Sequence, residues 1–458
     1  MAGTQHAQWS SRWAFIMAAV GSAVGLGNIW KFPYEAGEGG GGAFVILYLI
    51  FVFVIGAPCL IAELSLGRRG QKSPVNTMKS IATEEGKSTM WGLLGWSGII
   101  GAFIIISFYS LVGGWVLAYI VKAAMGFGGF DAAQSTETFL NFIADPVQPI
   151  IAHFIFMAIT VSIVARGVQG GLEKAVTVLM PALFAILVML MIYSGITGDF
   201  AAAIDFLFRP NFHALTGDKI LNALGLSFFS LSLAMGSIMT YGSYLPKDVN
   251  IPRSAITIAG ADSAVALMAG LAIFPIVFAY GLNPGGGGGL VFMTLPIAFG
   301  QMPMGGVIGP LFFALLAVAA VTSSISLLEP GVSYIEERTG WSRKKVTAII
   351  GFSAFLLGTL SSFGQPGNLL GDLQFFGSMT IMDVKDYLTN NIIMPLGAMF
   401  MMIFVGWFVS RKAMMEELAI EDKSFRVWYF LVRFICPVAI FAVFANIIYD
   451  TIIQPMLG

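Results

Sequence analysis

Charged residues are scarce in this chain. Asp, Glu, Lys and Arg make up only 11% of its 458 residues, whereas hydrophobic residues make up 57%, and the mean hydropathy is +0.84. Soluble globular domains carry about 25% charged residues, so the composition excludes that class and indicates a helical membrane protein with many spans. The formal net charge of −1 gives no sign of nucleic acid as a partner.

Cysteine and histidine are also rare. The two cysteines, Cys59 and Cys436, lie in apolar runs, which predicts packing residues rather than a disulfide or a metal site. The three histidines are spread along the chain and form no cluster for a transition metal. No nucleophile–base pair is evident in the apolar segments, so we do not expect an enzyme.

Long apolar segments fill most of the sequence. A bilayer-spanning helix needs about 20 apolar residues, and the hydropathy predicts eleven spans. They are 12–35, 42–67, 91–124, 149–166, 171–195, 220–244, 253–282, 307–337, 345–363, 386–410 and 425–453.

Basic residues favour the connections that follow the even-numbered spans. These connections hold Arg68, Arg69, Lys72, Lys79, Lys87, Arg166, Lys174, Lys247, Arg253, Arg338, Arg343, Lys344, Lys345, Arg411, Lys412, Lys423 and Arg426. The positive-inside rule places them, together with the N-terminus, in the cytoplasm. An odd number of spans then puts the C-terminus outside.

Two of the predicted spans contain residues that disfavour a continuous helix. The first holds Gly21, Gly25 and Gly27 ahead of the polar Asn28, and glycine weakens a helix interior. The sixth holds a run of small polar residues in its middle, namely Ser227, Ser230, Ser232, Ala234, Gly236 and Ser237. Broken helices at matching places in two inverted halves indicate a transporter site near the membrane midplane.

The spacing of the two interrupted spans predicts the domain organisation. They lie five spans apart, so we expect one transporter domain over 1–458 with a first repeat at 12–195 and an inverted repeat at 220–410. The segment 425–453 would be an additional helix. One alternative stays open, because Gly21-x-x-x-Gly25 is also a pattern that lets helices pack closely.

A broken helix frees polar backbone groups for binding. The half-helix that begins near Leu26 would point N–H groups at the midplane, where they can hold a carboxylate. Carbonyls freed near Gly21, Ala23 and Val24 suit a small hard cation. The side chains of Asn28, Ser230, Thr322 and Ser323 offer further oxygens.

Asp262 lies deep in the seventh span, about ten residues beyond Pro252. An unpaired charge inside a membrane costs several kcal/mol, so a role as a cation ligand is the favoured interpretation. The alternative is a structural partner of a buried hydroxyl network.

Several stretches carry a family resemblance. They are WSSR (9–12), GSAVGLGNIWKFPYEAGEGGGGAF (21–44), FFSLSLAMGSIMTYGSY (228–244) and VTSSISLLEP (321–330). The chain resembles the neurotransmitter:sodium symporter family along essentially its whole length, and above all the bacterial amino-acid transporters with eleven transmembrane helices. This resemblance implies an all-α, five-plus-five inverted-repeat fold with unwound helices 1 and 6. It also implies a location in a bacterial inner (plasma) membrane.

The resemblance implies one substrate site and two sodium ions as cofactors. The first sodium site would use Ala23, Asn28, Ser230 and Asp262 with the substrate carboxylate, and the second would use Gly21, Val24, Ala319, Thr322 and Ser323. The substrate site would use Ala23, Leu26, Gly27, Ile105, Tyr109, Phe229, Ser232, Met235, Ser323 and Leu327.

Gates on both sides of the site follow from the same resemblance. Lys31 and Asp386 would pair across the outer vestibule. Lys31 stands where many members have arginine and lacks the bidentate fork, so the pair would be looser. The cytoplasmic side would be closed by Trp9, Arg12, Ser243, Tyr244 and Glu337.

Asp262 stands where chloride-dependent relatives have a neutral amide. A fixed carboxylate there would take the place of chloride, so we expect transport to be chloride-independent. The resemblance therefore predicts a sodium-coupled symporter that imports a neutral, hydrophobic or aromatic amino acid by alternating access. Its partners would be that small substrate and membrane lipid. The oligomeric state stays open, with a monomer sufficient for transport.

Other functions stay open as alternatives. A sodium-coupled transporter of another small zwitterion such as proline or betaine fits the same features. A channel would conduct far faster than a transporter turns over, and a receptor that only binds would show no uptake. Saturable, sodium-dependent uptake separates a symporter from a channel or a receptor, and uptake of a panel of labelled amino acids separates the possible substrates.

Overall fold

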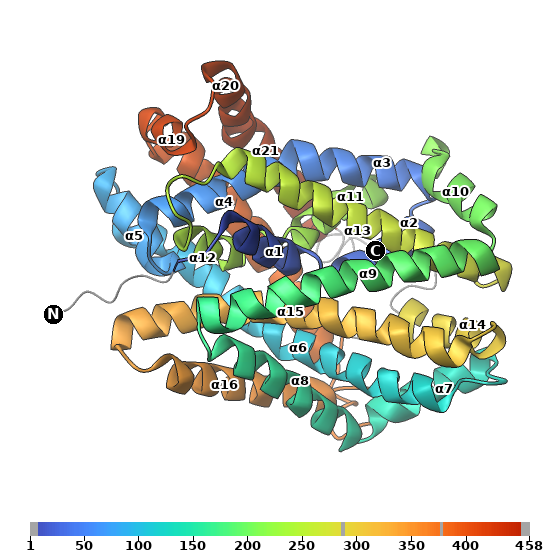
Figure 1. Cartoon of the computed structure of the whole chain (residues 1–458). Helices are drawn as coiled ribbons and strands as arrows, with labels where there is room; N and C mark the ends of the chain where they lie inside the picture. Colours follow the sequence, from blue (N-terminus) through green and yellow to red (C-terminus); the bar gives the residue numbers. More distant parts are fainter. Residues whose placement is uncertain (1–7, 285–288, 376–378, 450–458) are drawn as a thin grey trace.

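Helices form almost all of the regular structure of the chain. The computed structural model describes residues 8–284, 289–375 and 379–449. Most of its helices run along one common direction (Figure 1). Within the described residues the β-structure is limited to two isolated bridges, Gly41 with Pro210 and Phe375 with Met379.

The first half of the chain supplies the helices that line and flank the interior. In chain order they are α1 (Arg12–Ala23), η1 (Gly27–Lys31), α2 (Phe32–Glu38), α3 (Gly42–Phe51), η2 (Val52–Gly56), α4 (Ala57–Gly70), α5 (Pro74–Glu84), η3 (Thr89–Trp91), α6 (Gly92–Met125), α7 (Ala132–Ala144), α8 (Gln148–Val164), η4 (Val168–Glu173) and α9 (Lys174–Thr197). Two short helices, α10 (Phe200–Phe208) and η5 (Phe212–Ala214), connect them to the second half.

The second half repeats the alternation of long and interrupted helices. It contains α11 (Gly217–Ser230), α12 (Ser237–Ser243), α13 (Ile251–Ala279), η7 (Leu290–Thr294), α14 (Leu295–Gln301), α15 (Gly305–Thr339), α16 (Arg343–Phe363), α17 (Ile381–Asp386), η8 (Tyr387–Ile393), α18 (Met394–Ile403), η9 (Phe404–Phe408), α19 (Arg411–Leu418), α20 (Asp422–Phe430), η10 (Leu431–Ile435) and α21 (Cys436–Ile448).

Each predicted span overlaps one helix or a series of consecutive helical segments. Within the described residues, eight helices are long and apolar enough to cross a bilayer, or ten if two bent pairs are counted as spans. The α11–α12 pair falls outside that count because residues 231–236 separate its two parts. The number eleven and the inverted repeat therefore stay predictions. Residues 450–453 of the last predicted span lie outside the described residues.

The interrupted helices lie inside the bundle. All residues from Ala14 to Ala23 of α1 are buried, and so are all seven residues of α12. The long helices α6 and α15 pack along each other, and α15 also contacts α1 and α12. By contrast α9 buries only a small part of its apolar surface, as expected for a helix that faces lipid. A site built on the broken helices is thus enclosed by protein.

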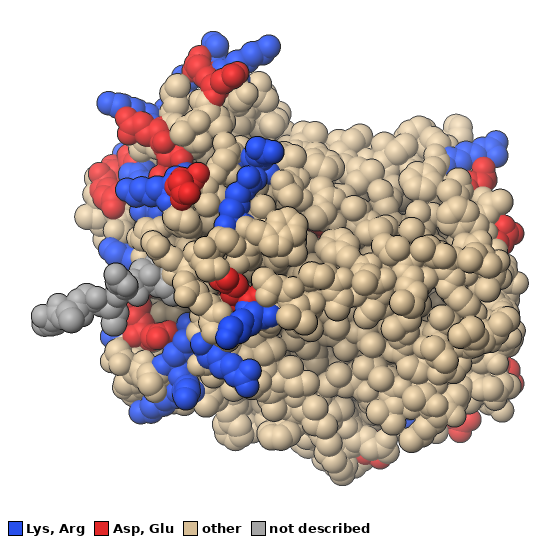
Figure 2. Space-filling model, in the orientation of Figure 1, with Lys and Arg blue, Asp and Glu red and all other residues tan. Residues whose placement is uncertain are grey.

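Charge is distributed unevenly along the bundle. Lys, Arg, Asp and Glu side chains crowd the end that carries α5, α19 and α20, and a broad uncharged band covers most of the rest (Figure 2). Exposed aliphatic and aromatic side chains such as Ile151, Val178 and Phe352 lie on the surface. The arrangement matches a multi-pass membrane protein, in which apolar surface faces lipid.

Candidate substrate and ion site

The first helix is interrupted at the position that the glycines predict. Residues 24–26 separate α1 from η1, and the two parts of the helix are bent by 48°. In the break the N–H of Gly25 donates to Asn28 Oδ1 at 3.1 Å, and the N–H of Leu26 lies 3.4 Å from the hydroxyl oxygen of Tyr109. The backbone N–H groups here thus reach side chains rather than continuing the helix.

Close packing at the glycines is also real. A Cβ on Gly25 would lie 2.5 Å from Ser323 Oγ, and a Cβ on Gly21 would lie 3.1 Å from Met180 Sδ. The packing alternative is therefore correct for both glycines, and it coexists with the break.

The second interruption, between α11 and α12, is longer. Within it Ser232, Ala234 and Gly236 all have positive φ, at 53°, 62° and 72°, a conformation that costs non-glycine residues energy. The buried carboxylate of Glu63 accepts a hydrogen bond from the N–H of Ala234. This hydrogen bond satisfies the N–H of a backbone segment that has left the helix.

A hydrogen bond connects the two breaks. The hydroxyl of Ser232 donates to the carbonyl of Ser22 at 2.8 Å, and the hydroxyl of Ser22 lies 2.8 Å from Ser326 Oγ. The carbonyl end of α1 is therefore held against the second break by side chains. Sequence reasoning did not assign Ser22, although it lies among the glycines of span one.

Beside the first break lies a buried cluster around Asp262, which is fully buried. One carboxylate oxygen accepts from Asn28 Nδ2 at 2.7 Å, and the other accepts from Ser230 Oγ at 2.6 Å and from the hydroxyl of Tyr48 at 3.0 Å. No lysine or arginine nitrogen in the described part of the chain lies within 4.0 Å of it. The structure thus brings Asn28, Ser230 and Asp262 together, as the first predicted ion site requires.

Two details of this cluster differ from expectation. Asn28 turns its amide nitrogen, not its oxygen, toward Asp262 and Ser230, because carboxylate and hydroxyl oxygens accept hydrogen bonds. Tyr48, which sequence reasoning did not assign, completes the cluster from α3. The sequence did offer a signal for Tyr48, because a tyrosine hydroxyl inside an apolar span needs a polar partner.

A second group of oxygens gathers between α1 and α15. The hydroxyl of Ser323 lies 3.3 Å from the carbonyl of Gly21 and 3.4 Å from that of Val24, and Thr322 Oγ1 donates to the carbonyl of Ala319 at 3.0 Å. All five residues predicted for the second ion site therefore lie together. Oxygen-only donor sets suit Na⁺, and no group of three His, Cys, Asp or Glu side chains occurs in the described ranges.

A small cavity of about 30 Å³ lies where the two breaks meet. It is lined by all ten residues predicted for the substrate site, namely Ala23, Leu26, Gly27, Ile105, Tyr109, Phe229, Ser232, Met235, Ser323 and Leu327, and also by Ser22, Gly25 and Ser230. None of these lining residues is Asp, Glu, Lys, Arg or His. The walls are therefore apolar apart from hydroxyls and the freed backbone.

An outer cavity of about 250 Å³ opens beyond this one. Tyr109 and Phe229 line both cavities and so form the boundary between them. Lys31 and Asp386 line the outer cavity, yet they form no ion pair within 4.0 Å among the described residues. Instead the Lys31 ammonium lies over the Phe229 ring, 5.2 Å from its centroid.

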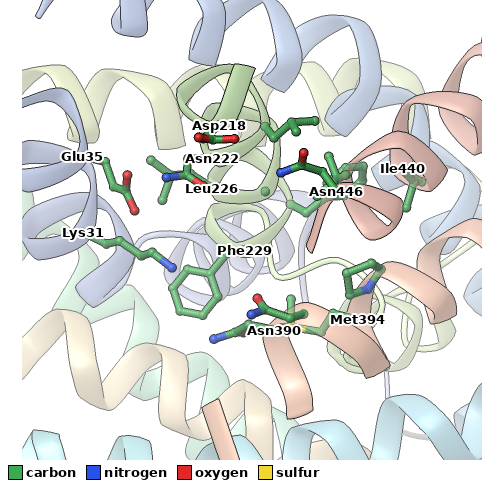
Figure 3. Close-up of a pocket in the computed structure, with 16 residues that line it drawn as sticks. Lys31, Glu35, Asp218, Asn222, Leu226, Phe229, Asn390, Met394, Ile440 and Asn446 are labelled. Atoms are coloured by element: carbon green, nitrogen blue, oxygen red, sulfur yellow. The ribbon is translucent and has the colours of Figure 1, made fainter. Parts of the chain in front are cut away.

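Asn390 is a further residue at this outer boundary that sequence reasoning did not assign. Its Nδ2 donates to Asp386 Oδ1 at 2.6 Å, so it orients the carboxylate. A side cavity of about 230 Å³ lies behind Lys31, Phe229 and Asn390. In Figure 3 the Lys31 side chain reaches toward the ring of Phe229, and Asn390 lies on the other side of that ring.

The opposite end of the site is closed by aromatic side chains. Trp9 is almost fully buried; its Nε1 donates to the carbonyl of Tyr241 at 3.0 Å, and its ring lies edge-on to those of Tyr241 and Tyr244. The hydroxyl of Tyr244 donates to Glu329 at 2.7 Å, and the guanidinium of Arg343 pairs with the same buried carboxylate. Ser243 lies in this region, where its hydroxyl donates to the carbonyl of Thr240 at 2.7 Å.

Two of the predicted gate residues are not brought together. Arg12 is exposed at the start of α1. Glu337 instead accepts a hydrogen bond from the N–H of Ser73 at 2.8 Å. The buried ion pair at this end is Arg343 with Glu329, which sequence reasoning missed because helix rotation decides which charges face inward.

Comparison with known proteins identifies relatives over the whole chain. The model of the sodium:neurotransmitter symporter family matches residues 6–127 and 143–456. The uncharacterized sodium-dependent transporter YhdH of Bacillus subtilis is 40% identical over 98% of this chain and 99% of its own length. An uncharacterized sodium-dependent transporter of Haemophilus influenzae is 33% identical over 96% of this chain and 98% of its own length.

A solved structure has the same architecture. The crystal structure of MhsT in complex with L-phenylalanine superposes with a TM-score of 0.88 at 40% identity, covering 96% of this chain and 99% of that chain. At this similarity the two proteins share a fold with helices in equivalent places.

Proposed function

Since the chain belongs to the sodium:neurotransmitter symporter family and is a sodium-dependent transporter, we propose that it imports a neutral, hydrophobic amino acid together with sodium ions. The observation that carries this proposal is the cavity at the meeting point of the two broken helices. Apolar walls and freed backbone groups surround it. These are the features that a zwitterion with an apolar side chain requires.

The cavity supports a neutral substrate side chain. A charged side chain would need a buried partner of opposite sign, and the lining residues offer none. Ile105, Leu327 and Met235 supply apolar surface, and methionine adapts to different shapes. The similarity to MhsT, whose structure contains L-phenylalanine, supports a hydrophobic or aromatic substrate.

The two ends of an amino acid fit the two kinds of backbone group in the breaks. The substrate carboxylate would lie at the N-terminal end of η1, near the N–H groups of Leu26 and Gly27 and the hydroxyl of Tyr109, where the helix dipole favours negative charge. The ammonium would lie near the carbonyls of Ala23, Phe229 and Ser232.

Sodium would bind at the two oxygen clusters. In the cluster around Asp262, a half-turn of the Asn28 amide would present its oxygen to the ion in place of its nitrogen, and Asp262 would supply the negative charge. In the other cluster, the carbonyls of Gly21, Val24 and Ala319 would join the hydroxyls of Thr322 and Ser323.

Energetics favour two ions over one. A tenfold gradient contributes about 1.4 kcal/mol per ion, and 100 mV contributes about 2.3 kcal/mol per charge. Two sodium ions thus supply roughly 7 kcal/mol, enough for about a 10⁵-fold accumulation of a zwitterion. One ion would support only a few hundredfold.

Chloride would not be required. Hydroxyls of Tyr48 and Ser230 donate to one oxygen of Asp262, and such donors could hold an anion. The fixed carboxylate already occupies this place, so we propose that Asp262 replaces chloride.

The gating contacts support alternating access. One end of the site is sealed by Trp9, Tyr241 and Tyr244, whereas the other opens into the outer cavity beyond Tyr109 and Phe229. With the N-terminus in the cytoplasm, this conformation would face outward. Closure would bring the Lys31 ammonium from the Phe229 ring to the Asp386 carboxylate.

Uptake into proteoliposomes tests the proposal. We expect saturable, sodium-driven uptake of labelled L-phenylalanine or L-leucine, and little uptake of L-lysine, L-glutamate, L-proline or betaine. Uptake that is equal with sodium and potassium would overturn the coupling. Uptake confined to proline or betaine would overturn the substrate class.

A further inference from the structure

Three arginines, one each from α19, α20 and η10, gather beside η9, far from the substrate cavity. The guanidinium carbons of Arg411 and Arg433 each lie 5.9 Å from the centroid of the Tyr429 ring. Arg433 also lies 4.1 Å from the centroid of Trp407. We call Arg411, Arg426, Arg433, Tyr429 and Trp407 the arginine–aromatic cluster.

The positive charge of this cluster exceeds the negative charge beside it. Arg411 and Arg426 share one carboxylate, that of Asp422, at 3.8 and 3.0 Å. Arg433 forms no ion pair within 4.0 Å in the part of the chain that the structure describes, and its Nε is buried without a hydrogen-bond partner. Aromatic rings satisfy the face of a guanidinium but accept none of its N–H donors.

The cluster lies where the apolar surface of the bundle ends. Residues 387–410 contain no charged residue, and neither do residues 434–449, so Arg411 and Arg433 are the first charges at this edge. Trp407 is 53% exposed, and Phe430 and Phe434 are exposed beside it. Exposed aromatic residues at such an edge typically lie at the level of lipid headgroups.

The shape of the molecule agrees with a position of the cluster at the level of the lipid headgroups. Helices α19 and α20 protrude from the bundle (Figure 1), and their charged side chains lie at the crowded end in Figure 2. The η10–α21 segment continues from there as an apolar helix with exposed Val438 and Phe441. Arg433 thus lies at the transition from a charged helix to an apolar one.

We propose that the arginine–aromatic cluster binds the phosphate of an anionic phospholipid in the cytoplasmic leaflet. The planar guanidinium fork matches phosphate oxygens, and basic sites between membrane helices bind anionic headgroups. Arg433 and Arg411, which both lie beside Tyr429, hold the phosphate. The exposed rings of Trp407 and Phe434 lie beside the acyl chains.

Bound lipid stabilises the packing of α20 and α21 against α18. Protein contacts already hold this corner: Tyr429 donates to the carbonyl of Gly406 at 2.9 Å, and Trp407 Nε1 donates to the carbonyl of Arg433 at 3.1 Å. A ligand that binds only the folded form raises the unfolding temperature in proportion to the logarithm of its concentration. Lipid binding is therefore measurable as a thermal shift.

The test compares two lipids that differ in headgroup charge. Purified full-length protein in mild detergent is titrated with phosphatidylglycerol or with phosphatidylcholine of the same acyl chains, and thermal unfolding is followed. We expect phosphatidylglycerol to raise the unfolding midpoint by several degrees more than phosphatidylcholine. The R411Q/R433Q variant should lose this difference, and R433Q alone should lose about half of it.

A matched control removes the same number of charges from two positions outside the cluster, Lys412 next to Arg411 in α19 and Arg209 after α10. Lys412 and Arg209 are highly exposed, so K412Q/R209Q should keep the full lipid preference. The proposal is overturned if R411Q/R433Q keeps the preference, if K412Q/R209Q loses it, or if inorganic phosphate alone gives the same stabilisation. If R411Q/R433Q does not fold, the single variant R433Q is used instead. An undiminished preference of R433Q for phosphatidylglycerol would then contradict the proposed site. Sodium-driven uptake in phosphatidylcholine liposomes should persist in R433Q, so a failure here is distinguishable from a failure of the transport proposal.

Discussion

The two broken helices that enclose the cavity are interrupted in different ways. Only residues 24–26 separate α1 from η1, and none of them has a positive φ. Residues 231–236 separate α11 from α12, and three of them are left-handed. The first helix is broken over a short stretch in which Val24 is extended, whereas the second is rebuilt over a longer stretch.

The contacts around the two breaks also differ. Around the first break the carbonyls of Gly21, Ser22 and Val24 converge on the Ser323 hydroxyl, and Asn28 reaches the buried Asp262. The second break is held by the carboxylate of Glu63 at Ala234. The comparison suggests a partial division of roles, in which both proposed sodium clusters are built on the first helix, whereas the second break mainly shapes the substrate pocket. The following predictions test that division, in order of decreasing effect.

The largest effect is expected at the first break. Asn28→Ala removes the amide that donates to both Asp262 and Ser230, and it removes the oxygen proposed to bind sodium. Losing the partner of a buried charge costs roughly 3 kcal/mol, which corresponds to about a 100-fold weaker apparent sodium affinity. Sodium titration of L-phenylalanine binding measures this change. The exposed Asn141→Ala in α7 is the control, and an unchanged sodium affinity in Asn28→Ala would contradict the assignment.

Asp262→Asn tests the carboxylate beside the same break. The substitution keeps the shape but removes the charge, while the hydroxyls of Tyr48 and Ser230 remain as donors. We expect uptake to fall about tenfold without chloride, the loss of roughly one charge-assisted hydrogen bond, and to recover when chloride is added. Uptake compared in chloride and gluconate media is the measurement. A variant that transports normally without chloride would refute the idea that Asp262 replaces it.

Glu63→Gln should affect the second break rather than the first. It replaces the carboxyl group that accepts from the N–H of Ala234 and weakens this buried hydrogen bond by about 1 kcal/mol, so the affinity for L-phenylalanine should fall about fivefold. The apparent sodium affinity at saturating substrate should change little. Glu137→Gln, an exposed position on α7, is the matched control. A larger change in the apparent sodium affinity than in the affinity for L-phenylalanine would contradict the division of roles.

Ala234→Gly is expected to have the smallest effect. Alanine at a φ of 62° carries strain that glycine lacks, so the variant should be more stable by about 0.5–1 kcal/mol. The unfolding midpoint should rise slightly, and the affinity for L-phenylalanine should change less than about threefold. Ala234→Val is the opposing variant, since a β-branched residue disfavours positive φ. If Ala234→Gly lowered the midpoint as much as Ala234→Val, strain at this position would not explain the shape of the break.

Much of the fold could be predicted from the sequence, because membrane helices obey simple composition rules. The glycines with Asn28 and the serines of 220–244 located both breaks. The ten predicted substrate-site residues, carried by the family resemblance, line one cavity. Local sequence pattern and family motif together therefore predicted where the helices break and which residues line the cavity.

Contacts between distant helices could not be predicted in the same way. Tyr48 at Asp262, Asn390 at Asp386 and Arg343 at Glu329 each depend on helix rotation and on which neighbour packs alongside. Neither charge pattern nor hydropathy records those rotations. Arg12 and Glu337 show the opposite case. Both were expected at one gate, but Arg12 is exposed and Glu337 accepts a hydrogen bond from the N–H of Ser73.

The coupling of sodium to amino-acid binding is the central claim, and thermal unfolding of the purified protein tests it most directly. The midpoint is measured with L-phenylalanine in sodium and in potassium at equal ionic strength, with L-glutamate as the control ligand. Because a ligand stabilises only the state that binds it, the account predicts a clear rise with L-phenylalanine in sodium and almost none in potassium or with L-glutamate. Equal stabilisation in sodium and potassium would contradict it.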